Sequence, residues 1–351
     1  MPGETCPAPG VELIISSHCS VRESVIGGLN RSISPAGRTT ISRRVEAESG
    51  VTMGDIDVAI GVDADCVAGW LGSYGGADSP ADLSRGLSAG NEGIPRLLQL
   101  FEDEDISTSW YVPGHTIETF RDEIEAVAAA GHELGVHGYS HENPTDLSRE
   151  QEDAILEVSI DLIEDVTGEE PVGHRASWWE FSENTPELVE KHGFLYDSSL
   201  MEREFEPGWM RNGDDWTPIQ YEQDPETWME PYEYGEETDV VEIPISWYRD
   251  DIPPMLFIKQ PLYHAGYKDP KMMYEQYYKR QFDFLYNRRG AGVYTFTIHP
   301  DLHGLPHMIA HLEEFIQYVK SHENADFQTL ETIARKYEDD PSVYESEGDY
   351  I

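Results

Sequence analysis

Strand-like and helix-like segments alternate along the chain from Asp57 onward. The strand-like runs are short and apolar, and they cover residues 57–62, 106–112, 133–137, 172–175, 194–200, 240–246 and 292–299. The helix-like runs cover residues 94–102, 117–130, 148–166, 185–192, 272–287, 308–319 and 330–337. Ser148 and Gln151 predict a capping box at the start of one helix. The alternation predicts a parallel sheet. The span 53–337 fits one (β/α) barrel of about 250 residues, with an open doubly wound sheet as the alternative.

The two ends of the chain lack this pattern. Residues 1–52 have no sustained period, and their five arginines balance five glutamates. Met53 stands directly before the first strand, so residues 1–52 are expected to be a disordered extension or to follow from a start placed too far upstream. Residues 338–351 are acidic and predict a solvated tail.

The formal net charge is −44, from 24 basic and 68 acidic residues. A surface this acidic repels nucleic acid and anionic lipid, so neither is an expected partner. The charge predicts a protein of high-salt surroundings, where the Debye length falls to about 3 Å at 1 M.

No apolar run reaches the roughly 18 residues of a transmembrane helix. Cys6, Cys19 and Cys66 suit a reducing cytosol, so the expected location is cytoplasmic.

Two aspartates and two histidines follow separate strand-like runs. Asp63 and Asp65 end the first run, and His137 and His141 stand four residues apart after a later one. A histidine pair at this spacing also occurs on surface helices that bind no metal. Because ligands collect at the carboxyl ends of barrel strands, one carboxylate and two imidazoles fit an open zinc site, with the second carboxylate left as a base. The pattern favours a metal-dependent hydrolase.

Several motifs occur in a fixed order: GVDAD at 61–65, AGWLGSYGG at 68–76, HGYSHENP at 137–144, GHRASWW at 173–179, SWYRDD at 246–251 and His299-Pro300. Over residues 55–337 the chain resembles the polysaccharide deacetylase superfamily, the NodB-homology domain. The resemblance implies a distorted (β/α) barrel in a single domain. Within the superfamily, the motifs are similar to the branch that contains peptidoglycan-deacetylase-like proteins and cyclic imide hydrolases.

The resemblance implies that Asp63 is the catalytic base and that Asp65, His137 and His141 hold a divalent metal, expected to be zinc. The common family pattern has the two aspartates adjacent, whereas Ala64 separates them here. This spacing agrees with the branch but leaves open which carboxylate has which role. A carboxylate beside a metal-bound water can accept its proton whatever the family.

The resemblance also assigns residues around this centre. Arg175 would hold the base in its ionised form, and His299 would act as the acid. Tyr139, Trp178 and Trp179 would contact the substrate. Each assignment has a plain structural alternative: Arg175 in an ion pair, His299 at a strand end, and the tryptophans in the core.

Two features stand outside this scheme. Histidines recur at 299, 303, 307 and 311, but Pro300, Gly304 and Pro306 exclude one continuous helix, so only the last two are expected to share a surface helix. Residues 202–239 form a long acidic segment with many aromatics. It is either a functional or oligomer-contact loop or a solvated excursion held down by its aromatics.

The sequence therefore predicts a metal-dependent hydrolase of non-peptide amide carbon–nitrogen bonds. Its substrate is expected to be a small molecule or a glycan: a cyclic imide or ureide, which the branch motifs favour, or an N-acetylated sugar. The alternatives are a metal-independent, allantoinase-like ring hydrolase and a catalytically inactive carbohydrate-binding barrel. The joint presence of acid, base and ligand positions argues against the inactive barrel. The sequence neither predicts nor excludes a homo-oligomer.

The charge generates the first prediction. Residues 53–351 carry the whole charge of −44 because residues 1–52 are balanced, so self-repulsion should weaken the fold when salt is removed. We expect a lower melting temperature in dilute buffer than in molar potassium chloride. Equal melting temperatures in the two solutions would contradict a high-salt protein.

Overall fold

The computed structural model describes residues 54–258 and 269–346 of the chain. The expected extension 1–52 and the last five residues, 347–351, lie outside the described residues. The account below concerns the compact unit Ala47–Ile351. No helix among its described residues is long and apolar enough to cross a membrane.

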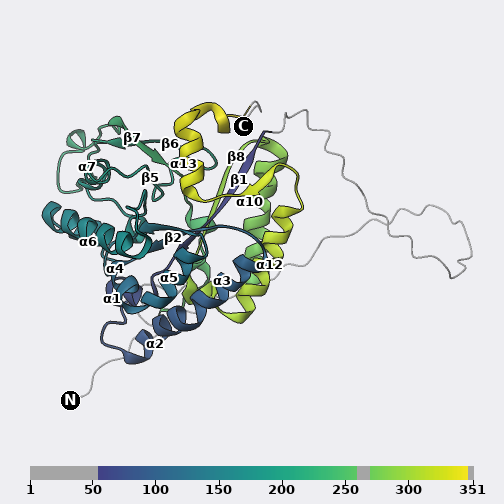
Figure 1. The fold of residues 1–351 in the computed structure, drawn as a ribbon. Helices are drawn as coiled ribbons and strands as arrows, with labels where there is room; N and C mark the ends of the chain where they lie inside the picture. Colours follow the sequence, from purple (N-terminus) through teal and green to yellow (C-terminus); the bar gives the residue numbers. More distant parts are fainter. Residues whose placement is uncertain (1–53, 259–268, 347–351) are drawn as a thin grey trace, which may run out of the picture. The chain divides into compact units, whose positions relative to one another are not determined.

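A nine-stranded sheet forms the centre of this unit. Its strands are β1 (Ile56–Asp63), β2 (Ser109–Val112), β3 (Glu133–Val136), β4 (Gly173–His174), β5 (Tyr196–Asp197), β6 (Gly208–Asn212), β7 (Glu236–Glu242), β8 (Gly292–Ile298) and β9 (Ala325–Phe327). The hydrogen-bonded order is β6-β7-β5-β4-β3-β2-β1-β8, and β9 pairs with the start of β1. All pairs are parallel except β6 with β7. Figure 1 shows β1 and β8 side by side although their sequences lie far apart.

Residues that follow β7 contact β8, the strand at the opposite edge of the sheet. Asp250 forms a parallel bridge with Thr297 of β8, and Thr295 Oγ1 donates a hydrogen bond to Pro244 O at 2.5 Å. Val293 N donates to Phe205 O at 2.9 Å. The sheet is thus a curled, incompletely regular (β/α) barrel, as the sequence predicted, and not the open doubly wound alternative.

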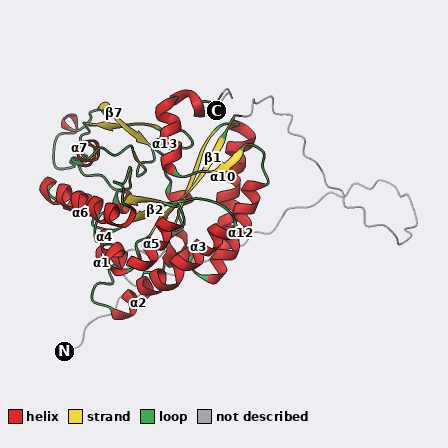
Figure 2. Ribbon diagram, viewed as in Figure 1, coloured by secondary structure: helices red, strands yellow, loops and turns green. Residues whose placement is uncertain are grey.

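Helices cover the outside of the strands (Figure 2). They are α1 (Cys66–Gly72), α2 (Pro80–Ser88), α3 (Ile94–Asp103), α4 (Gly114–Thr119), α5 (Arg121–Ala129), α6 (Arg149–Thr167), α7 (Thr185–Lys191), α8 (Ile252–Met255), α9 (Pro270–Met273), α10 (Lys279–Phe284), α11 (Pro300–His303), α12 (Pro306–Lys320) and α13 (Leu330–Asp339). The predicted capping box of α6 is confirmed. The single helix expected over 117–130 is wrong, because Phe120, at φ −124° and ψ 46°, separates α4 from α5.

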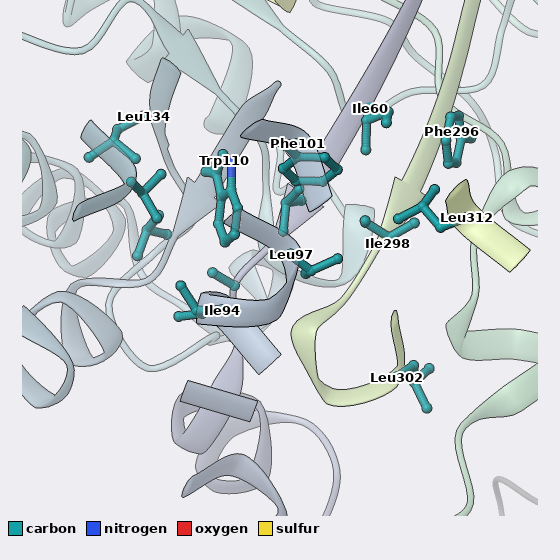
Figure 3. Close-up of a cluster of buried hydrophobic side chains, with 14 of the residues drawn as sticks. Ile60, Ile94, Leu97, Phe101, Trp110, Leu134, Phe296, Ile298, Leu302 and Leu312 are labelled. Atoms are coloured by element: carbon teal, nitrogen blue, oxygen red, sulfur yellow. The ribbon is translucent and has the colours of Figure 1, made fainter. Parts of the chain in front are cut away.

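The core lies between the strands and the outer helices. Figure 3 shows Ile60, Phe296 and Ile298 of β1 and β8 beside Leu97 of α3 and Leu312 of α12. All five side chains are at most 1 % exposed. Burial of such a side chain contributes about 1.5–3 kcal/mol, so this packing holds the strand ends in fixed positions.

The C-terminal segment differs from the solvated tail expected for 338–351. A turn at Pro341–Tyr344 follows α13, and Tyr344 is only 1 % exposed. Its hydroxyl donates a hydrogen bond to Asp57 Oδ2 at 2.6 Å, and Lys336 Nζ lies 2.8 Å from the same oxygen. The buried carboxylate of Asp57 needs these partners, which explains why the chain folds back here.

The acidic segment 202–239 contributes β6 and the start of β7, joined as an antiparallel pair. Phe205 is buried, but Trp216, Tyr221 and Tyr234 are exposed. Only some of the aromatic side chains in segment 202–239 are therefore packed against the rest of the described structure. Arg211 fixes the hairpin through Asp214, with its Nε 2.9 Å from the carboxylate.

The contact of Tyr344 with Asp57 generates a stability prediction. We expect Tyr344→Phe to lower the free energy of unfolding by about 1–2 kcal/mol, because a buried acceptor loses a donor while Lys336 remains. Urea titration in molar salt measures the change. Tyr221→Phe is the matched control, since Tyr221 is 86 % exposed. An equal effect of the two substitutions would mean that Tyr344 does not stabilise Asp57.

Candidate active site

The predicted chemical residues follow the carboxyl ends of neighbouring parallel strands. Asp63 ends β1, His137 follows β3, Arg175 follows β4, and His299 follows β8. These strands are parallel members of one sheet, with β2 between β3 and β1, so their carboxyl ends meet on one side of it. Each of these four side chains is at most 3 % exposed. The structure thus gathers residues that are up to 236 positions apart, 299 − 63, into one site.

Asp65, His137 and His141 form a cluster that could hold a metal ion. Asp65 Oδ1 lies 3.4 Å from His137 Nε2, and Asp65 Oδ2 lies 3.4 Å from His141 Nε2. His137 Nδ1 donates to Arg175 O at 2.8 Å, which leaves its Nε2 lone pair free to coordinate. His141 lies in the turn after β3, not on a helix, so the surface-helix interpretation of the histidine pair is wrong.

The donor set of this cluster fits a divalent cation. One carboxylate oxygen and two imidazole nitrogens are the ligands of open zinc sites. Asp65 Oδ1 is buried and has no hydrogen-bond partner among the described residues, as expected of a ligand atom. Burial opposes the ionisation of Asp65, but His141, His137 and His299 lower its pKa below the ordinary value. Burial lowers the pKa of His141 to about 4, which keeps this imidazole neutral and able to coordinate.

Asp63 has a different set of partners. Its Oδ1 accepts a hydrogen bond from Arg175 Nη1 at 2.7 Å, and its Oδ2 accepts one from Trp179 Nε1 at 3.2 Å. Arg175 is itself held, because its Nε donates to Ser198 O at 2.8 Å and its guanidinium lies 4.0 Å from the centre of the Tyr111 ring. A guanidinium at this distance orients the carboxylate.

His299 faces these carboxylates from β8. Its Nε2 lies 3.9 Å from Asp63 Oδ2 and 3.7 Å from Asp65 Oδ2. On its other side, Nδ1 donates to Asp251 Oδ1 at 2.7 Å. Burial alone would lower the pKa of His299, but Asp251 and the neighbouring carboxylates raise it well above the ordinary value. His299 is therefore placed to carry a proton toward the space between Asp63 and Asp65.

Asp251 and His303 are supporting residues that were not predicted. Asp251 contacts His303 Nδ1 through its second oxygen, which also accepts from His299 N at 3.0 Å. His303 Nε2 is hydrogen-bonded to Tyr274 at 2.6 Å. The motif SWYRDD contained Asp251, but its partners lie 48 and 52 residues further along the chain. As predicted, α11 and α12 are separate helices, and His307 and His311 lie on α12.

A cavity of about 440 Å³ opens onto this centre. Its polar lining comes from the catalytic end, with Asp63, Ser73, Tyr74, His141, Asp250 and His299, and from Glu180. The remaining wall is apolar and consists of Trp178, Trp179, Trp247, Ile252, Pro253 and Ile258. Trp179 and Trp247 stack with ring centres 4.3 Å apart. Trp178 and Trp179 have positive φ values of 64° and 54°, a strained conformation typical of functional sites.

Tyr139 is not among the residues that line this cavity. Its hydroxyl contacts Glu118, and its ring lies 6.5 Å from that of His115 on α4. The structure therefore does not support its prediction as a substrate contact, because a side chain leaving the β3 turn can point to either side. Tyr74, which was in a motif but was assigned no role, donates to Asp65 Oδ2 at 2.5 Å.

Comparisons with known proteins agree with this geometry. The polysaccharide deacetylase family model matches residues 82–196. A peptidoglycan deacetylase of Helicobacter pylori is 48 % identical over 280 residues, which cover 80 % of this chain and 95 % of the relative. A peptidoglycan deacetylase-like protein of Gibberella zeae is 33 % identical, and the alignment covers 80 % of this chain and 86 % of the relative.

Solved structures show the same fold. A candidate polysaccharide deacetylase of Mycobacterium smegmatis superposes with a TM-score of 0.70 at 26 % identity, covering 86 % of this chain and 95 % of the other. An allantoinase superposes with a TM-score of 0.65 at 22 % identity, covering 82 % and 91 % of the two chains, which is a likeness of fold alone. The chain belongs to the polysaccharide deacetylase family, and it is a hydrolase acting on carbon–nitrogen bonds other than peptide bonds.

Proposed function

We propose that this protein is a metal-dependent hydrolase that opens small cyclic imides or ureides. The distribution of polar groups in the cavity carries this proposal. Apart from Glu180, the polar side chains lie at the catalytic end, and the rest of the wall is aromatic or aliphatic. A sugar ring needs hydrogen-bonding partners for its hydroxyl groups, whereas a flat ring amide buries its carbon atoms against such a wall.

Asp65, His137 and His141 are the residues that would hold the metal, and their donor set favours zinc. A bound divalent ion lowers the pKa of its water to about 7 and polarises the amide carbonyl. His137 is oriented for this task by Arg175 O. Tyr74 orients the Asp65 carboxylate through its hydroxyl.

Asp63 is the proposed base. It accepts the proton of the attacking water, because its carboxylate faces the cavity and is held by Arg175 and Trp179. His299 is the proposed acid. It delivers a proton from Nε2 to the leaving nitrogen, while Asp251 stabilises the imidazolium from the opposite side.

A second candidate is the deacetylation of an N-acetylated sugar. The relative at 48 % identity is named a peptidoglycan deacetylase, and the faces of Trp178, Trp179 and Trp247 could stack on a sugar ring. The same residues would perform the chemistry, since both reactions hydrolyse an amide through a proton acceptor and a proton donor. The difference lies in how the substrate is recognised.

A substrate panel separates the two candidates. We expect protein purified in molar salt with zinc to open succinimide, hydantoin or allantoin with a kcat/KM at least about tenfold above that for acetate release from N-acetylglucosamine oligomers, because a missing polar contact costs about this much. Chromatography of the ring-opened acids and an acetate assay measure the two reactions. Acetate release without ring opening would establish the sugar candidate instead.

Paired amide variants test the division of labour between the two aspartates. We expect Asp63→Asn to keep bound metal while turnover falls by about 10²–10⁴, because the proton acceptor is lost. Asp65→Asn should lose metal first, since a neutral amide is a poorer partner for a dication. Arg175→Ala should resemble Asp63→Asn in milder form. Elemental analysis and turnover are the measurements, and Asp161→Asn on the exposed face of α6 is the matched control.

Two results would contradict this assignment. If Asp63→Asn empties the site while Asp65→Asn leaves it filled, the two carboxylates have the opposite roles. If the metal-stripped protein retains full activity, the metal-independent, allantoinase-like mechanism is correct.

A further inference from the structure

Two adjacent carboxyl groups, Asp250 and Asp251, lie between the turn Trp247–Arg249 and α8, and both are at most 1 % exposed. Asp251 has two imidazole partners, His299 and His303, and it also accepts from His299 N. Among the described residues, Asp250 Oδ1 accepts a hydrogen bond from Ile252 N alone, at 3.2 Å. It also lies 3.7 Å from His299 Nδ1, but that nitrogen already donates to Asp251 at 2.7 Å.

These surroundings separate the protonation states of the two groups. Neighbouring buried carboxyls do not both ionise without matching cations. The imidazoles at hydrogen-bond distance belong to Asp251. Although burial opposes the ionisation of Asp251, His299 and His303 lower its pKa to about 2. Burial raises the pKa of Asp250 well above the ordinary value; His299 opposes this, while the charges of Asp251 and Asp63 add to it. This environment favours the protonated form of Asp250, in which the carboxyl group presents a hydroxyl donor.

Asp250 also faces the substrate space. It lines the 440 Å³ cavity together with Asp63 and His299, at the edge where the apolar wall of Trp247, Ile252 and Pro253 begins. Neither of the two steps assigned to Asp63 and His299 requires it. A buried carboxylic acid kept neutral in an enzyme cavity is a strong hydrogen-bond donor to a carbonyl oxygen.

We propose that Asp250 is a substrate-binding residue whose carboxylic acid donates a hydrogen bond to the second carbonyl oxygen of a cyclic imide or ureide, while the first carbonyl lies at the catalytic centre. The inference rests on the proposed function and specifies it further, because an imide or ureide has two ring carbonyls and a simple lactam has one. Asp250 would thus favour ligands with two ring carbonyls over ligands with one.

Two substitutions at Asp250 and two ligands test this role. Asp250→Leu removes the donor with little change of size, and Asp250→Asn supplies an amide N–H in its place. We expect Asp250→Leu to raise KM for succinimide about tenfold with a smaller change in kcat, and Asp250→Asn to recover most of that loss. The inhibition constant of 2-pyrrolidinone, the lactam with one carbonyl, should change less than about twofold in both variants. Asp239→Leu, at an exposed position of β7, is the control for the substitution itself.

Each other outcome overturns the inference. Equal losses for succinimide and 2-pyrrolidinone would mean that Asp250 only shapes the cavity, and an Asp250→Asn variant as impaired as Asp250→Leu would mean that the group acts as an ionised acceptor. Melting temperature and metal content identify a variant that has merely misfolded, and in that case Asp250→Asn decides alone. If wild-type protein opens no imide or ureide, the proposed function falls and this inference with it; if it does and Asp250→Leu binds succinimide normally, only the inference falls.

Discussion

The buried ion pair between Arg175 and Asp63 is the interaction on which the arrangement of the site depends. Both side chains are 1 % exposed, and the pair joins the ends of β4 and β1 across the inside of the barrel. Loss of either partner would leave an uncompensated buried charge, at a cost of about 3–5 kcal/mol. Strand β1 itself leaves room for the guanidinium, because a Cβ at Gly61 would lie only 2.5 Å from Arg175 Nη1. The same contact thus fixes the strand ends and the proposed base.

The two carboxyl pairs of the site follow one physical rule. Asp63 and Asp65 lie two positions apart, yet a guanidinium holds the first and imidazoles surround the second. Asp250 and Asp251 are adjacent, yet among the described residues the imidazoles of His299 and His303 are hydrogen-bonded to Asp251 and not to Asp250. Residue type alone therefore does not assign a role, because the partners of each carboxyl decide whether it is a proton acceptor, a ligand, a counter-ion or a neutral donor.

The sequence predicted the parts of the structure that depend on local pattern. Apolar runs ended by polar residues placed Asp63, His137 and His299 at strand ends, and β1 and β8 are both wholly buried, as such runs require. Contacts between distant segments were not predictable in this way. The pairing of Asp251 with His303 depends on how α11 follows β8, and the burial of Tyr344 depends on its contact with the buried carboxylate of Asp57 at the far end of β1. The role predicted for Tyr139 depends in the same way on contacts between distant segments, because the sequence places this residue in a turn without fixing the side to which its ring points.

The acidity of the chain and the chemistry of the site act over different distances. Salt at about 1 M screens exposed charges within about 3 Å, but buried pairs such as Arg175 with Asp63 are screened much less. Salt therefore acts on the fold through its surface and leaves the internal arrangement of charges in place. A neutral amide or imide approaches a surface of −44 without electrostatic opposition. Hydrolysis of its carbon–nitrogen bond creates a carboxylate, which the same field repels. For a ring amide, the surface charge thus opposes rebinding of the acidic product and does not hinder entry of the neutral substrate.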